Sequence, residues 1–157
     1  MTRKKAVLAF FIFLVINFAA LGIGGLFTTD GVSSEWYANL NKAPWTPSGW
    51  VFGAAWSFIM VCFSFYMTGL WSRSDNRKKM GLLFVIQLVL NISWNPIFFK
   101  FQNVTLGLAV ISLLTILITY FLFHYRSLLK TKSVLVIPYF IWLLIATSLN
   151  AYILIQN

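Results

Sequence analysis

Long apolar stretches without a single charged residue fill most of the sequence. They run over about 6–27, 50–71, 80–99, 104–123 and 134–155. Each has the roughly 20 residues that a helix needs to cross the hydrocarbon core of a bilayer. Their apolar residues lie all round the helix, as expected where lipid replaces water. The pattern predicts an all-α, polytopic membrane protein, with residues 1–157 forming a single domain of five transmembrane helices.

The composition supports this class and removes several kinds of chemistry. Hydrophobic residues make up 60% of the chain and charged residues 10%, against about a quarter charged in soluble proteins. The carboxylates are Asp30, Glu35 and Asp75, and there is one histidine, His124, and one cysteine, Cys62. This set supplies no internal disulfide, no multi-histidine metal site and no nucleophile–base pair. We expect no metal site.

The net charge of +9 is explained by membrane orientation. Ten of the twelve basic residues flank the apolar stretches on one side, and only Lys42 and Lys100 fall on the other. The positive-inside rule then predicts a cytoplasmic N-terminus and an extracytoplasmic C-terminus, in the cell membrane of a bacterium. Nucleic-acid binding is not expected. The first stretch could instead be a signal peptide, although its apolar run is longer than usual.

A long connection, about 28–49, separates the first two stretches. Asp30 and Gly31 form a turn signal near its start. Pro44 and Pro47 favour extended backbone, so the later part should form an ordered, non-helical strap. A structured loop of this length is uncommon unless it is functional.

Tryptophans gather in and just after this connection. The rings of Trp36 and Trp45 could belong to an aromatic belt at the membrane interface, as we expect for Trp71. Alternatively, they belong to a lid over a cavity among the helix ends. The sequence leaves both interpretations open.

Polar side chains occur at membrane depth in the third stretch. Gln87, Asn91 and Asn95 are four residues apart, and Trp94 follows Asn91 by three, so all share one helix face. Amides facing lipid would stay unpaired, so this face should point inward. They meet either other helices or a polar ligand. Pro96 should distort the helix here.

Small residues suggest close approach in two other helices. In the fifth stretch Ala146 leaves a gap that either a neighbouring helix or a flat apolar ligand could fill. In the first stretch Ala20 and Gly24 form a small-xxx-small pair, which permits close helix packing. The inward face of the fifth stretch comprises Tyr139, Trp142, Ala146, Leu149 and Asn150.

Several aromatic motifs occur in order along the chain. They are Trp36-Tyr37-x-x-Leu40-x-Lys42, Pro44-Trp45-Thr46-Pro47, Trp50-Val51-Phe52, Trp56, Gln87-x-x-x-Asn91-x-x-Trp94, Phe98-Phe99 and Pro138-Tyr139-x-x-Trp142-x-x-x-Ala146-Thr147-x-Leu149-Asn150. Together they resemble the TspO/MBR family of tryptophan-rich sensory and translocator proteins, the peripheral-type benzodiazepine receptors. The resemblance implies a five-helix bundle, usually a homodimer in the lipid bilayer, with a pocket that the first loop opens. It also implies binding of porphyrins such as protoporphyrin IX or haem, and of benzodiazepine-type and isoquinoline carboxamide ligands.

Carried over by position, the resemblance implies a ligand site lined by Trp36, Trp45, Pro47, Trp56, Asn91, Trp94, Tyr139, Trp142, Ala146 and Leu149. The chain also departs from the family. It has Ala43 and Ser48 where members commonly have proline, so a more mobile loop is expected. Leu106 stands where animal members have a tryptophan. The cholesterol motif of animal members lacks its basic residue after Tyr152, so cholesterol recognition is not expected.

The leading hypothesis is a porphyrin-binding membrane protein that senses, transports or disposes of its ligand and requires no cofactor. The alternative is a light-dependent porphyrin-degrading enzyme, for which Trp56 and Trp142 are the catalytic candidates. A facilitative transporter of apolar metabolites is the third hypothesis. Ion-coupled pumping is not expected, because the apolar stretches contain no ionisable relay residue.

Overall fold

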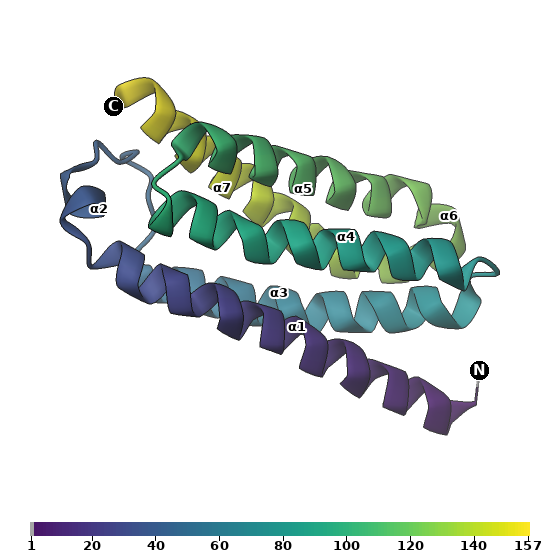
Figure 1. Cartoon of the computed structure of the whole chain (residues 1–157). Helices are drawn as coiled ribbons and strands as arrows, with labels where there is room; N and C mark the ends of the chain where they lie inside the picture. Colours follow the sequence, from purple (N-terminus) through teal and green to yellow (C-terminus); the bar gives the residue numbers. More distant parts are fainter. Residues whose placement is uncertain (1) are drawn as a thin grey trace.

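Five long helices run side by side through the structure, a computed structural model that describes residues 2–157 (Figure 1). All five are long and apolar enough to cross a membrane, and residues 2–157 contain no β-strand. They are α1 (Arg3–Val32), α3 (Gly49–Arg73), α4 (Arg77–Asn95), which continues into a π-helical turn, η1 (Pro96–Lys100), then α5 (Val104–His124) and α7 (Ile137–Gln156). The predictions of an all-α fold and of five spanning helices are confirmed.

The helices pack in an order that differs from their order in the sequence. Helix α1 packs between α3 and α4, and α5 packs between α4 and α7. Helix α3 also meets α7, over a shorter length. The bundle has two ends (Figure 1). The N-terminus, the α3–α4 turn, α6 (Arg126–Leu129) and the 3-10 helix η2 (Lys130–Val136) lie at one, here called the basic end. The short helix α2 (Glu35–Asn39) and the C-terminus lie at the other, the loop end.

Short polar caps explain where several helices begin. The Asn76 side chain accepts a hydrogen bond from the Lys79 amide at 2.9 Å, and Asn103 accepts one from Leu106 at 2.9 Å. Ser34 caps α2 in the same way by accepting from Tyr37. Such caps satisfy amides that a helix start leaves unpaired.

The first helix continues further than the sequence suggested, so the predicted turn at Asp30 and Gly31 is wrong. Both residues lie in the last turns of α1. The Thr28 hydroxyl folds back onto the Gly24 carbonyl at 3.2 Å, so a polar residue stays compatible with the helix. Gly31 packs directly against the Phe99 ring of η1, a contact that the helical backbone makes possible. Tertiary packing therefore overrides the local turn signal.

The predicted distortion at Pro96 takes the form of a π-helical turn. Helix α4 ends at Asn95, and the Phe101 amide donates to the Pro96 carbonyl at 2.9 Å. Proline has no amide hydrogen to continue the α-helical ladder, and the wider turn accommodates this. The turn buries Phe98 and Phe99 at the loop end.

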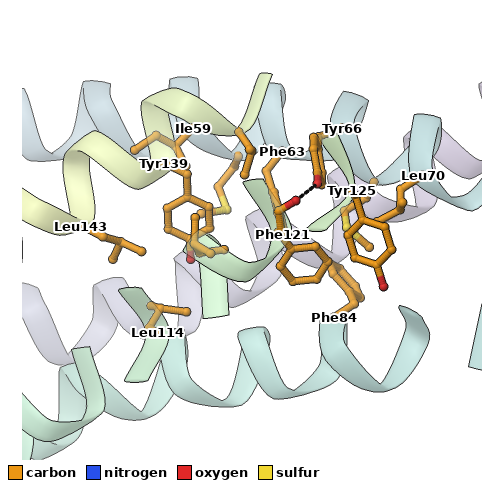
Figure 2. Packing of buried hydrophobic residues seen from close by; sticks show 14 of the residues in the cluster. Ile59, Phe63, Tyr66, Leu70, Phe84, Leu114, Phe121, Tyr125, Tyr139 and Leu143 are labelled. Atoms are coloured by element: carbon orange, nitrogen blue, oxygen red, sulfur yellow. Dashed lines mark hydrogen bonds between the residues drawn. The ribbon is translucent and has the colours of Figure 1, made fainter. Parts of the chain in front are cut away.

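A cluster of aromatic rings forms the core in the half of the bundle nearer the basic end (Figure 2). The Phe63 ring meets Tyr139 edge-on at 5.3 Å and Phe121 edge-on at 5.9 Å. The Tyr66 hydroxyl, which is fully buried, donates to the Phe121 carbonyl at 2.6 Å. Edge-to-face rings pack densely, and the Tyr66 hydroxyl among them has a hydrogen-bond partner. This cluster joins α3, α5 and α7.

Small residues allow close contact between helices, as predicted for Ala20 and Gly24, which are both buried. A Cβ atom on Gly24 would lie 2.6 Å from the Asn95 amide nitrogen. A Cβ atom on Gly107 of α5 would likewise lie 3.2 Å from the Asn150 Oδ1 atom. Gly31 is tighter still, because an added Cβ would overlap the Phe99 ring.

We expect Gly31→Ala to lower the free energy of unfolding by about 1–3 kcal/mol, because overpacking forces the Phe99 ring and η1 to shift. Gly25→Ala is the matched control. It lies in the same helix, and an added Cβ there meets nothing within 4 Å. Denaturant unfolding of both variants in detergent micelles measures the difference. If Gly31→Ala proves as stable as Gly25→Ala, the close packing of α1 on η1 is not what the structure indicates.

Candidate functional site

Aromatic rings from α3 and α7 pair with one another on the side of the core cluster that faces the loop end. Trp56 meets Tyr139 edge-on at 5.7 Å, and Phe52 meets Trp142 edge-on at 5.3 Å. The two α3 residues are four apart and the two α7 residues three apart, so each pair shares one helix face. The structure thus brings Trp56, Tyr139 and Trp142 together. The two tryptophans are each paired with a different ring rather than with each other.

The amides of α4 point inward, as predicted, and bond to α7. The buried Tyr139 hydroxyl accepts from Gln87 Nε2 at 2.8 Å and from Asn91 Nδ2 at 2.7 Å. In this structure another helix therefore satisfies these two donors. The Gln87 Oε1 atom accepts no hydrogen bond from any residue that the structure describes.

A second polar junction lies nearer the loop end. Trp94 Nε1 donates to Asn150 Oδ1 at 3.1 Å, and Asn150 Nδ2 donates to the Val104 carbonyl at 3.0 Å. Asn150 therefore joins α4, α5 and α7. The remaining amide of the α4 face, Asn95, turns toward α1, where its Oδ1 accepts from the Thr28 hydroxyl at 2.7 Å.

The α1–α3 connection, residues 33–48, lies across the loop end and is held by aromatic contacts (Figure 1). The Trp36 ring of α2 packs edge-on against Phe98 at 5.5 Å. Tyr37 packs on Phe99 at 5.6 Å, and burial raises the pKa of the Tyr37 hydroxyl. The sequence did not reveal α2, although Ser34 before an acidic residue is an N-cap signal.

The later part of this connection is non-helical, as its prolines predicted, and is tied to the C-terminal helix. It contains a turn in which the Thr46 amide donates to the Ala43 carbonyl at 2.9 Å. Trp45 Nε1 donates to the Ser148 hydroxyl at 3.2 Å, and its ring meets Tyr152 edge-on at 5.3 Å. The Asn41 amide donates to the Asn157 side chain at 2.9 Å. Trp45 nevertheless stays 53% exposed. Trp45 therefore has one feature of each interpretation. Its ring is exposed, as in an interfacial residue, and its N–H is hydrogen-bonded to α7, as in a lid residue.

Besides Gln87 Oε1, a buried donor in the aromatic region has no partner within the described residues. Trp142 is 8% exposed, and its Nε1 donor finds no acceptor within residues 2–157. Trp142 also borders an apolar cavity of about 270 Å³ between α3 and α7, which Ala55 and Ile141 help to line. One and two turns further along α7 lie Ala146, which is half-buried, and Leu149, which is buried. The cavity is slightly smaller than the roughly 300–1,000 Å³ typical of small-molecule sites.

The structure divides the sequence-based list into two sets and some separate residues. Trp56 and Asn91 both contact Tyr139, and Trp142 belongs to the same core cluster as Tyr139. Trp36 and Trp94 meet through Phe98 nearer the loop end. Trp45 is a separate anchor on α7, and Pro47 is half-buried just before α3. Sequence reasoning missed as site residues Phe52, Phe98, Asn150 and Ser148. The signal for Phe52 was its place four residues before Trp56, and that for Asn150 was its place on the inward face of the fifth stretch.

The region offers flat aromatic surfaces, amide groups and one free indole donor. Within residues 2–157 no three His, Cys, Asp or Glu side chains gather closely enough to hold a metal ion. Its chemistry is therefore that of stacking and hydrogen bonding in an apolar setting.

Comparison with known proteins agrees with this arrangement. The sequence profile of the TspO/MBR family matches residues 10–156. The chain is 33% identical to a tryptophan-rich protein TspO of Archaeoglobus fulgidus, over 91% of this chain and 94% of the relative. It is 30% identical to a tryptophan-rich sensory protein of Cereibacter sphaeroides, over 90% and 86%, and 30% identical to the human translocator protein, over 76% and 73%. The chain belongs to the TspO/MBR family and is an integral, multi-pass membrane protein.

Proposed function

We propose that the protein binds porphyrins of the protoporphyrin IX type, and other flat aromatic ligands, between α3, α4 and α7, for sensing, transport or disposal. The observation that carries this proposal is the buried Trp142 N–H, which has no acceptor within the described chain and belongs to a residue that lines an apolar cavity. An unpaired donor in an apolar region costs about 1–3 kcal/mol, and a ligand acceptor would recover that cost. The names of the relatives, sensory protein and translocator protein, are consistent with a ligand-handling role.

The residues suit a large planar ligand with a few polar groups. The rings of Trp56, Phe52 and Trp142 can turn from their present edge contacts to stacking on a ligand face, which adds about 0.5–1.5 kcal/mol for each aromatic contact. Porphyrin propionates are acceptors, and they match the Trp142 indole N–H and the Asn91 amide. Asn91 now donates to Tyr139 at 2.7 Å, so a ligand must replace that bond or share it.

A porphyrin is larger than the space between α3 and α7, so binding requires side chains to move. The connection over residues 33–48 is the element best placed to open. Trp45 holds it to α7 through one hydrogen bond and one ring contact, both at the bundle rim. Residues 33–48 therefore serve as a lid, and its opening precedes ligand entry.

We expect Ala146→Thr to weaken protoporphyrin IX binding about tenfold, because it adds a hydroxyl and a methyl at a small residue one helical turn from Trp142. The hydroxyl can bond a carbonyl one turn back, so the helix tolerates the change. Titration of the purified protein with protoporphyrin IX in the dark, followed by tryptophan quenching, measures the affinity. Ala109→Thr, on the exposed side of α5, is the control.

Two outcomes would overturn the proposal. The first is wild-type protein that does not bind protoporphyrin IX saturably. The second is Ala146→Thr that folds and binds as tightly as Ala109→Thr. Illuminating the saturated complex then separates the roles. Stable porphyrin absorbance indicates a carrier or sensor, and protein-dependent loss that Trp142→Phe abolishes indicates a light-dependent enzyme.

We also propose that the basic end faces the cytoplasm and the loop end the outside. The charge distribution supports this, because ten of the twelve basic residues belong to the basic end. In the proposed orientation, the lid and the C-terminus are extracytoplasmic.

Labelling of single cysteines tests this orientation on a Cys62→Ser background. A membrane-impermeant maleimide should label Ser33→Cys in intact bacterial cells, and should label Asp75→Cys only after the cells are broken. Both positions are exposed, at opposite ends of the bundle. The reverse pattern would show that the charge rule fails for this chain.

A further inference from the structure

A second cavity, of about 870 Å³, lies at the basic end, where the chain passes from α5 through α6 and η2 into α7. Its lining has two parts. One part is polar and carries the cations Arg126 and Lys130 with the hydroxyl of Ser133. The other part is apolar and includes Phe123 and Val134. The cavity is thus amphipathic, because cations, hydroxyls and hydrocarbon side chains all contribute to its lining.

The hydroxyl of Ser133 is the clearest sign that this cavity holds a ligand. Ser133 is 6% exposed, and its Oγ atom has no hydrogen-bond partner in the part of the chain that the structure describes. Serines at helical positions commonly bond the carbonyl one turn back, as Ser64 does with Met60 at 2.7 Å. Ser133 makes no such bond, although it is one of the residues that line the cavity. A ligand with acceptor oxygens would satisfy it.

The charge around the cavity favours an anion. Of the three acidic residues, Asp30 and Glu35 lie toward the loop end, and Asp75 lies in the α3–α4 turn. Arg126 and Lys130 are four residues apart and exposed, so both can turn toward one ligand. The neighbouring cation Arg73 is engaged elsewhere, because it donates to the carbonyl of Leu129 at 3.4 Å and holds the end of α6 in place.

The apolar part of the cavity favours a lipid over a soluble anion. Phe123 is 62% exposed and Val134 58% exposed, so the apolar lining continues onto the outer surface of the bundle. That surface contacts lipid in the membrane. The polar part lies just beyond the end of α5, at the level where phospholipid headgroups sit. A phospholipid would reach both parts at once without leaving its leaflet.

We propose that this cavity is a binding site for an anionic phospholipid. Arg126 and Lys130 neutralise the headgroup, as basic pockets beside transmembrane helices do. The Ser133 hydroxyl donates to a phosphate oxygen, and the acyl chains lie against Phe123 and Val134. The site shares only Ile137 with the cavity beside Trp142, and it stands if the porphyrin proposal fails.

The test measures lipid binding by native mass spectrometry of delipidated protein in detergent. The probe is dioleoyl phosphatidylglycerol, and dioleoyl phosphatidylcholine is the zwitterionic comparison. We expect the wild-type protein to prefer phosphatidylglycerol. Replacing both cations by glutamine, Arg126→Gln with Lys130→Gln, should weaken its binding about 30-fold. Ser133→Ala should weaken it about fivefold, because one hydrogen bond is lost and no charge changes.

The matched control is Lys4→Gln with Lys5→Gln, which removes the same charge from exposed residues of α1 at the same end and outside the cavity. It should leave phosphatidylglycerol binding unchanged. Equal loss in both double variants would mean that surface charge alone attracts the lipid, and the site would be refuted. Equal binding of phosphatidylcholine would also refute it. Displacement of the lipid by an equimolar amount of glycerol 3-phosphate would show that the cavity binds a soluble anion instead. The same conclusion would follow if Ser133→Ala left lipid binding intact while glycerol 3-phosphate competed.

Discussion

A polar group inside the hydrocarbon must find its partner within the protein, and this constraint governs the bundle. Water is absent there, so each unpaired amide or hydroxyl costs several kcal/mol. The structure meets the constraint at a few junctions. The Tyr139 hydroxyl accepts from Gln87 and Asn91, and Asn150 links Trp94 to the Val104 carbonyl. These bonds fix the position of α4 along the bundle axis relative to α5 and α7. Apolar packing alone would leave the helices free to slide along one another.

The same junctions shape the candidate site. Most donors in the region are satisfied, so a ligand competes with bonds that already exist. The Trp142 N–H is the exception, and Trp142 lies one helical turn from the small residue Ala146. An incoming planar ligand gains most where a donor is free and where rings now meet only by their edges. The proposed lid bears on entry. Its hydrogen bond to Ser148 lies at the rim, whereas its Trp36 ring packs against Phe98, which is buried at the loop end.

Much of this fold could be predicted from the sequence because membrane helices are specified by uninterrupted apolar length. The inward direction of Gln87 and Asn91 followed from their spacing and from the cost of exposing amides to lipid. The extension of α1 past Gly31 could not be predicted, because it depends on the Phe99 ring of a distant segment. The partners of Trp56 and Trp142 were also hidden. The sequence places Trp142 on an inward face, and the family resemblance implies that Trp56 lies in the site. Only the relative height of α3 and α7 pairs Trp142 with Phe52 and Trp56 with Tyr139.

The central claim is that the Tyr139 hydroxyl holds α4 to α7. Tyr139→Phe tests it most directly, because the ring contacts remain while Gln87 and Asn91 lose their common acceptor. Reversible unfolding in micelles should show a loss of about 1–3 kcal/mol in the free energy of unfolding. Tyr152→Phe, at the rim beside Trp45, should change it by less than about 0.5 kcal/mol. A Tyr139→Phe protein as stable as Tyr152→Phe would contradict the account, because the helices would then be held by packing alone.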